Sequence, residues 1–280
     1  MGVRRPCVAG AFYPADRGSL RRTIEECFTH RLGPGKMPES KSPERRIISL
    51  VCPHAGYMYS GPVAAHCYFH LASEASPGSI VLIGPNHTGL GGPVSMMGSG
   101  AWETPLGKVD IDEDLAGEIF RASEIIDMDE LAHLREHSIE VQLPFLQYIY
   151  DEFKFVPICM GFQDLETSRE VGRSLAKALG GKSALILAST DLTHMESQTS
   201  ANTKDRGVIE RITSLDEAAL QDWVRSKRVS MCGYGPVSAA IVASRLLGAQ
   251  KAELLAYRTS GDVTGDLSSV VGYAAIKVTR

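Results

Sequence analysis

Residues 47–61, "IISLVCPHAGYMYSG", contain a short apolar run that is followed at once by a proline, a histidine and a glycine. The run 47–52 is nearly all apolar, which is typical of a strand buried on both faces of a sheet. Pro53 ends the strand ladder and Gly56 permits a sharp turn, so the chain can aim His54 inward from the strand end. By itself the stretch leaves two interpretations open: an ordinary turn residue, or a side chain held for chemistry.

The rest of the chain alternates strand-like and helix-like segments. Further strands are predicted at 79–84, 153–160, 183–189, 252–261 and 268–278, with extended segments and a turn over 93–109. Helices are predicted at 19–32, 62–72, 112–121, 138–150, 165–180, 200–226 and 236–249. This alternation favours an α/β fold, with residues 1–280 forming a single domain around a mainly parallel central sheet that has helices on both faces.

The composition argues against several classes of partner. The formal net charge is −4 and the basic residues are scattered, so we expect no nucleic-acid binding. No apolar stretch reaches the length of a membrane helix, and the N-terminus does not resemble a signal peptide, so we expect a cytoplasmic protein without membrane contact. The six cysteines include no CxxC pair, which favours buried thiols or ligands over disulfides.

Two more strands end in the same way as the first. "IVLIGPNHTG" places His87 just past a strand, and "ALILASTDLTH" places Asp191 and His194 past another. Ligands in open α/β sheets bind beyond the carboxyl ends of the strands, and neighbouring strands lie only about 4.8 Å apart. We therefore predict that these side chains, together with His54, converge on one site.

Two other stretches contain candidate site residues. Cys232 in "VSMCGYGPVSAA" precedes an apolar helix, where a thiol has a lowered pKa and serves as a ligand or nucleophile; the alternative is an inert buried cysteine. "LREHSIEVQLPF" contributes Glu136, His137, Glu140 and Gln142, either as a solvated helix start or as groups that orient ligands or bind substrate. The remaining histidines lack a strand-end setting and are expected to be structural: His30, His66, His70 and His133.

Several motifs together resemble one known family. In chain order they are "RRPCVAGAFYPAD", "CPHAGYMYSG", "IGPNHTG", "WETPLG", "EHSIEVQLPFL", "STDLTH", "MCGYGP" and "TSGDVTGDLSSVVGYAA". In this order and at these spacings the sequence resembles the Memo family, which is distantly similar in fold to class III extradiol dioxygenases. The resemblance implies an α/β fold with its site at the strand ends.

Carried over residue by residue, the resemblance implies a ligand set and a pocket. The metal ligands would be His54, His87 and Cys232, and the catalytic residues would be His194 as acid–base group with Asp191 orienting it. By the same matching, Phe12 and Tyr59 would line the substrate pocket, and His137 and Glu140 are expected beside them from the reading of "LREHSIEVQLPF". Two imidazoles and a thiolate form a softer set than the two histidines and a carboxylate of the dioxygenases, so we expect a divalent or redox metal, with iron or copper favoured over zinc.

Three functions remain open at this stage. The first is metal-dependent redox chemistry, similar to that of the dioxygenases, on an unknown small substrate. The second is a zinc hydrolase in which the same ligands activate water. The third is a non-catalytic module that binds a peptide or small molecule and works with a partner enzyme. The family grouping implies a radical-SAM protein and an AMMECR-type protein as partners.

Overall fold

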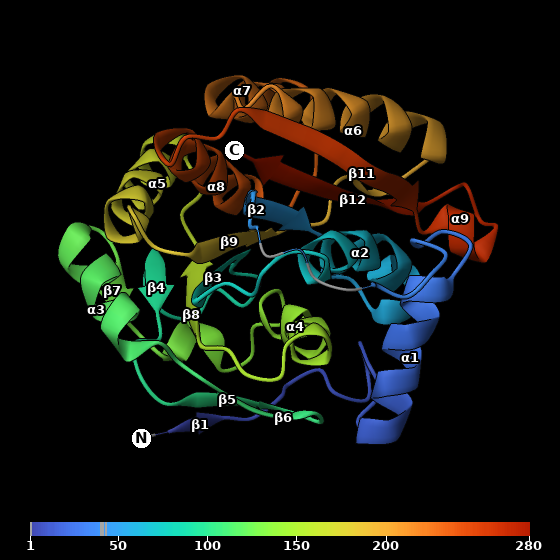
Figure 1. Ribbon diagram of the computed structural model, residues 1–280. Helices are drawn as coiled ribbons and strands as arrows, with labels where there is room; N and C mark the ends of the chain where they lie inside the picture. Colours follow the sequence, from blue (N-terminus) through green and yellow to red (C-terminus); the bar gives the residue numbers. More distant parts are fainter. Residues whose placement is uncertain (1, 40–41, 43) are drawn as a thin grey trace.

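The computed structural model describes residues 2–39, 42 and 44–280, and its centre is a mixed β-sheet (Figure 1). Four strands lie side by side and run parallel, in the order β2 (Ile47–Cys52), β9 (Ala184–Ser189), β3 (Ser79–Pro85) and β8 (Phe155–Met160). These are the predicted apolar runs, and nearly all their residues are buried. The predicted α/β fold class with a mainly parallel centre is confirmed.

Other strands extend the sheet on both sides. Beyond β2 lies β12 (Val270–Thr279), which is antiparallel to β2 and to β11 (Lys251–Thr259) and β10 (His194–Glu196). A short helix, α9 (Gly261–Thr264), connects β11 to β12. Beyond β8 lie β4 (Val94–Met96), which is antiparallel to β8, and β7 (Asp127–Met128).

Helices cover both faces of the sheet, as predicted. One face carries α1 (Arg17–Thr29), α2 (Tyr57–Ala72) and α4 (Leu143–Ile149), and the other carries α3 (Glu113–Ala122), α5 (Leu165–Leu179) and α8 (Tyr234–Leu246) (Figure 1). Helices α6 (Gln198–Thr213) and α7 (Glu217–Ser226) lie near β11 and β12. Strand β2 contributes Leu50 to one apolar core and Val51 to the other, which explains its uninterrupted apolar sequence.

A separate small sheet joins the N-terminus to the body of the protein. It consists of β1 (Val3–Arg4), β5 (Ala101–Thr104) and β6 (Gly107–Asp110). The guanidinium of Arg4 lies 4.1 Å from the ring centre of Trp102, and one of its nitrogens is 2.6 Å from the carboxylate of Glu140. Both members of this ion pair are buried, so the first strand is anchored by a charge pair inside the protein.

Most helix ends differ from the prediction by one to three residues, and three predicted helices differ by more. The segment predicted as one helix over 138–150 is a 3-10 turn, Glu140–Gln142, followed by α4, and Pro144 lies in the first turn of α4, where its missing N–H is tolerated. The predicted helix 200–226 breaks into α6 and α7 at Leu215, which has a φ of 55°. Helix α2 begins at Tyr57, five residues before the predicted start, with Pro62 inside it.

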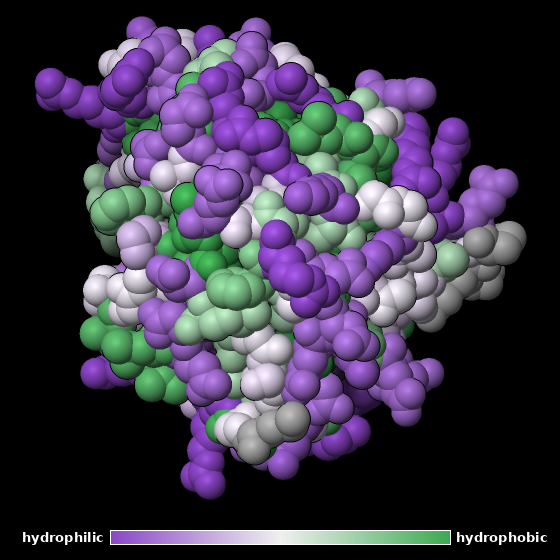
Figure 2. Space-filling model, turned by 90° about the vertical axis from the view of Figure 1, so that its left-hand side faces the viewer, coloured by the Kyte–Doolittle hydropathy of each residue, from purple (hydrophilic) through white to green (hydrophobic). Residues whose placement is uncertain are grey.

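The face of the molecule that is shown in Figure 2 is predominantly polar. The face that carries α3 and α5 is a mosaic of hydrophilic side chains with apolar groups between them (Figure 2). Among the described residues, no helix combines the length and the apolar character needed to cross a bilayer. The interpretation of residues 1–280 as one domain stays a prediction.

Candidate functional site

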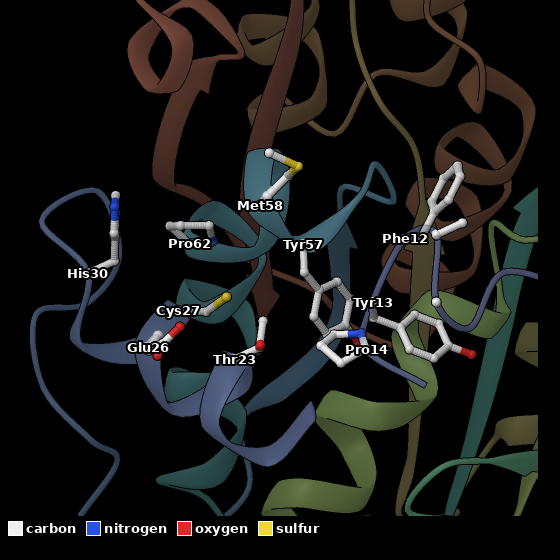
Figure 3. A pocket seen from close by; sticks show the side chains of 12 residues that line it. Phe12, Tyr13, Pro14, Thr23, Glu26, Cys27, His30, Tyr57, Met58 and Pro62 are labelled. Carbon is white, nitrogen blue, oxygen red and sulfur yellow. The ribbon is translucent and has the colours of Figure 1, made fainter. Parts of the chain in front are cut away.

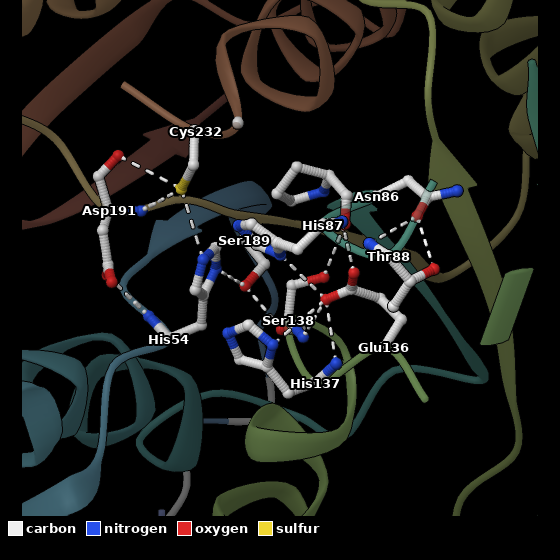
Figure 4. A network of polar contacts seen from close by, with 12 residues as sticks. His54, Asn86, His87, Thr88, Glu136, His137, Ser138, Ser189, Asp191 and Cys232 are labelled. Atoms are coloured by element: carbon white, nitrogen blue, oxygen red, sulfur yellow. Dashed lines mark hydrogen bonds and ion pairs between the residues drawn. The ribbon is translucent and has the colours of Figure 1, made fainter. Parts of the chain in front are cut away.

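The three strand ends meet, because β9 lies between β2 and β3 in the sheet. His54 follows β2, His87 follows β3, and Cys232 lies just before α8. One donor atom from each of these side chains falls in a group whose members all lie within 4.8 Å of one another (Figure 4). Two imidazoles and one thiol at this spacing suit a soft transition-metal ion.

His54 is buried and is held by contacts of its ring and of its backbone. Its side chain is buried, with Nδ1 lying 2.8 Å from Ser189 Oγ and Nε2 lying 3.2 Å from Cys232 Sγ. Its backbone N–H donates to Asp191 Oδ1 over 2.9 Å. Burial lowers the pKa of His54 well below the ordinary value, and the nearby imidazoles lower it further. The imidazole is therefore neutral, which is the form that binds metals.

His87 is more open to solvent and is oriented by Glu136. Its side chain is 34% exposed, and Nδ1 lies 3.0 Å from Glu136 Oε1. Burial lowers the pKa of His87, but the hydrogen bond and charge of Glu136 outweigh it, and the net shift is upward. A carboxylate accepts hydrogen bonds, so Nδ1 carries the proton and the other ring nitrogen, Nε2, keeps a lone pair that could bind a cation. Carboxylate–histidine pairs of this kind orient metal ligands in many proteins.

Glu136 is buried and stays ionised. Burial opposes its charge, but hydrogen bonds from the His87 side chain and from the backbone N–H groups of Ser138 and His87 lower its pKa to about 2. A second set of donor groups, His87, Glu136 and His137, also lies close together. Because the carboxylate already accepts these hydrogen bonds and one from the backbone of His137, we assign this set to ligand orientation rather than to a second metal.

Cys232 sits in a tight loop that lies against the end of β9. A Cβ atom at Gly233 would lie 2.5 Å from the backbone oxygen of Ser189, so only glycine permits this approach. The backbone N–H of Asp191 points at Cys232 Sγ over 3.2 Å. Burial raises the pKa of the Cys232 thiol, and the charge of Asp191 adds to this shift. The expected lowering of the pKa is thus wrong for the metal-free protein, because desolvation outweighs the helix N-terminus. A bound cation deprotonates a coordinating thiol.

His194 and Asp191 lie at the same edge but are not paired as expected. His194 Nδ1 lies 2.8 Å from the carbonyl oxygens of both Leu192 and Ser230, which orient the ring and leave Nε2 as the proton-accepting nitrogen. Asp191 instead accepts the hydrogen bond from the backbone of His54. Burial raises the pKa of Asp191 to about 6, although the N–H of His54 opposes that shift.

Of the ring-bearing residues expected to line the pocket, Phe12 and His137 lie beside the donor atoms, whereas Tyr59 packs against an apolar core. The ring of His137 stacks on His87 at a centroid distance of 4.7 Å and contacts Phe12 at 4.8 Å, so both lie beside the donor atoms. Tyr59 is partly buried in the first turn of α2 and packs against the apolar core of that face.

Glu140 does not line the site. Its carboxylate accepts hydrogen bonds from the Arg4 guanidinium, the Tyr13 hydroxyl and the backbone N–H groups of Cys7 and Val8. The side chain is fully buried by these partners, so the structure gives it an anchoring role for the N-terminal segment that carries Phe12. The prediction that Glu140 lines the substrate pocket is therefore corrected: its carboxylate anchors the N-terminal segment.

A separate cavity of about 430 Å³ lies between α1, the start of α2 and the loop 10–14 (Figure 3). Phe12, Tyr57, Met58 and Cys27 are among its lining residues. Phe12 thus borders this cavity and also contacts His137 of the donor cluster. The residues that line this cavity do not include His54, His87 or Cys232.

Two serines hold site histidines without a role that was predicted from the sequence: Ser189 contacts His54, and Ser230 contacts His194. Ser189 is the last residue of a predicted strand, directly before the "TDLTH" motif, and this position was the available signal. Ser230 had none. The six thiols all lie in described residues and are free, as predicted.

Comparisons with known proteins agree on one family. A family model described as Memo-like protein matches residues 4–277. A MEMO1 family protein of Methanothermobacter thermautotrophicus is 56% identical over 274 residues, covering 97% of this chain and 99% of that protein. A MEMO1 family protein of Methanopyrus kandleri is 54% identical over 280 residues, covering 99% of each. The crystal structure of an uncharacterized Escherichia coli K12 protein matches in fold, with a TM-score of 0.58 and 13% identity, over 82% of this chain and 99% of that one.

Proposed function

The chain belongs to the Memo family, and from that premise we propose that His54, His87 and Cys232 bind a divalent or redox metal that supports dioxygenase-like redox chemistry on a small substrate. The observation that carries the proposal is the convergence of three donor atoms within 4.8 Å from separate segments of the chain. Each imidazole is also held at Nδ1 by a buried polar partner. Such support is typical of metal-binding histidines.

The donor set favours iron or copper over zinc. A thiolate is a softer ligand than a carboxylate, and imidazole suits all three metals. When bound, the ion would supply redox chemistry at the open edge of the site. The partly exposed His87 marks the side from which a substrate approaches.

His194 is the residue proposed to move a proton. Its Nδ1 is committed to two carbonyl oxygens, so Nε2 accepts a proton from a substrate or water bound beside the ligands. Asp191 supports the site differently, by fixing the backbone of His54. His137 and Phe12 provide an aromatic wall on which a planar substrate packs.

Metal analysis of anaerobically purified protein tests the proposal. We expect the wild-type protein to contain iron or copper, and a His54→Ala/His87→Ala variant to lose it. His66→Ala is the matched control, because His66 is a partly buried histidine on α2 whose Nε2 lies 3.2 Å from the Leu32 carbonyl oxygen. Equal metal content in the double variant and the wild type would refute the proposal.

A zinc hydrolase is the second candidate, favoured by the proton-accepting Nε2 of His194 beside an open ligand set. It requires turnover that does not depend on oxygen, so a reaction that stops under anaerobic conditions would exclude it. A module that binds a peptide or small molecule without turnover is the third, and it is supported by the aromatic pair Phe12 and His137. Single-turnover chemistry would exclude that one.

The cellular setting is also part of the proposal. We place the protein in the cytoplasm, working with a radical-SAM protein and an AMMECR-type protein. Affinity purification from the native host, followed by identification of the proteins retained, tests these partners. Failure to recover either one with the wild-type protein would contradict this part of the proposal and leave the metal site unaffected.

A further inference from the structure

The hydroxyl of Ser189 is the central group of a buried hydrogen-bond network that contacts the ring of His54. Its oxygen is 2.8 Å from His54 Nδ1, 2.7 Å from the backbone oxygen of Ser138 and 2.8 Å from Gln142 Nε2. His54, Ser138, Gln142 and Ser189 are all at most 2% exposed. Solvent water therefore cannot replace a missing hydrogen-bond partner in this network. Each donated proton must come from one of these four residues or from a group that contacts them.

The orientation of the Gln142 amide follows from its neighbours. Its nitrogen lies 3.0 Å from the backbone oxygen of Pro53, which can only accept a hydrogen bond. Its side-chain oxygen accepts the hydroxyl proton of Tyr68. Both N–H groups of the amide are therefore donated, one to Pro53 and one to Ser189.

The proton on Ser189 is then fixed as well. A serine hydroxyl has one proton to donate, and the Ser138 carbonyl oxygen needs it because that oxygen can only accept. The N–H of Gln142 occupies one lone pair of Ser189, so the contact with His54 is satisfied when His54 Nδ1 donates. Reversing it would leave the buried Ser138 oxygen without this hydrogen bond, which is costly in a site closed to water.

We propose that Ser189 and Gln142 are positioning residues that hold His54 as the Nδ1–H tautomer, with the Nε2 lone pair facing Cys232 Sγ. His87 and His194 are held in the same tautomer by Glu136 and by two carbonyl oxygens. Three imidazoles thus present Nε2 lone pairs at one edge of the sheet. The significance for metal binding rests on the proposed function, whereas the tautomer itself does not.

The test measures the tautomer in metal-free protein and the metal affinity separately. Nitrogen-15 NMR of histidine-labelled protein, treated with chelator, distinguishes a protonated from an unprotonated ring nitrogen, and the His54 signals are assigned by their loss in His54→Ala. We expect the wild type to show Nδ1–H at His54. Ser189→Ala removes the hydroxyl that accepts the hydrogen bond from His54 Nδ1, so we expect a mixture of His54 tautomers. We also expect a metal affinity that is roughly 10- to 100-fold weaker, as for other losses of a ligand-orienting partner.

Ser49→Ala is the matched control. Ser49 is a buried serine on β2 whose hydroxyl bonds Ser244 Oγ over 2.7 Å, away from the ring of His54. We expect it to leave both the tautomer and the affinity at their wild-type values. An Nε2–H tautomer at His54 in the wild type would overturn the inference even if Ser189→Ala does not fold. An unchanged tautomer in a folded Ser189→Ala protein would overturn it too. A wild type that shows the Nδ1–H tautomer but binds no metal would support the inference and refute the proposed function.

Discussion

Replacing Glu136 by glutamine tests how the protein orients His87. The carboxylate accepts hydrogen bonds from His87 Nδ1 and from the backbone N–H groups of His87, His137 and Ser138. A glutamine of nearly the same size has one oxygen and one NH₂ group. The NH₂ group would face N–H donors, so at least one of these buried hydrogen bonds is lost.

The size of the effect follows from the pKa of Glu136. Its pKa falls from an ordinary value of 4.5 to about 2 in the folded protein. At about 1.4 kcal/mol per pKa unit, this difference corresponds to about 3 kcal/mol of folding stability. Since the folded-state pKa is the lower one, the unfolded chain binds more protons in this range. The contribution is complete above about pH 4.5 and is lost as the pH falls towards 2.

Urea unfolding of metal-free protein between pH 6 and pH 3.5, followed by tryptophan fluorescence, measures this contribution. We expect Glu136→Gln to lower the free energy of unfolding at pH 6 by about 3 kcal/mol and to flatten its decline with acid. Metal affinity should fall by roughly 10- to 100-fold, because His87 loses its orienting partner. Glu217→Gln is the control, since Glu217 is also a buried, ion-paired carboxylate but binds Arg169 and Arg245 instead. Wild-type metal affinity in Glu136→Gln would refute the reasoning.

Two further predictions concern buried charges. Burial raises the pKa of Asp191 from 3.8 to about 6, so its ionisation costs folding stability above pH 6 and that cost is relieved as the pH falls through 6 towards 4. Asp191→Asn should therefore make the chelator-treated protein more stable at pH 8 in urea unfolding, with the gain vanishing near pH 4; a less stable variant at pH 8 would contradict this. Arg4→Met leaves Glu140 buried without its cation and should cost about 3–5 kcal/mol. In the same assay Arg4→Met/Glu140→Gln should recover part of that loss, and no recovery would show that the charge is not the cause.

The central strands were predictable because a strand that is buried on both faces has an uninterrupted apolar sequence. Leu50 and Val51 of β2 point into opposite cores, so neither position tolerates a polar residue. The meeting of His54 and His87 at one edge followed from the rule that parallel strands present their carboxyl ends together. The strand order did not follow, because no local pattern records that β9 lies between β2 and β3.

The roles of the acidic residues were less predictable, because they depend on partners far away in the chain. Glu140 pairs with Arg4, which is 136 residues distant, and "LREHSIEVQLPF" alone cannot show that its two glutamates serve different purposes. Glu136 holds His87, whereas Glu140 anchors the N-terminal segment. The helix predicted over 138–150 failed for a related reason. The backbone N–H of Ser138 bonds the Glu136 carboxylate, so the chain is held in a turn just before Glu140.

Three buried groups of the site have pKa values shifted in the direction that favours the neutral form. Burial raises the pKa of Asp191 and of Cys232 and lowers that of His54, so each group is driven towards its neutral form. A nearby cation reverses this preference for the carboxyl and the thiol and needs the neutral form of the imidazole. If the proposed ion binds, it would remove a cost that burial of these groups imposes on the metal-free protein. This coupling connects the electrostatics of the strand ends to the proposed metal: the same burial that disfavours charge at Asp191 and Cys232 strengthens their attraction for a cation placed beside them.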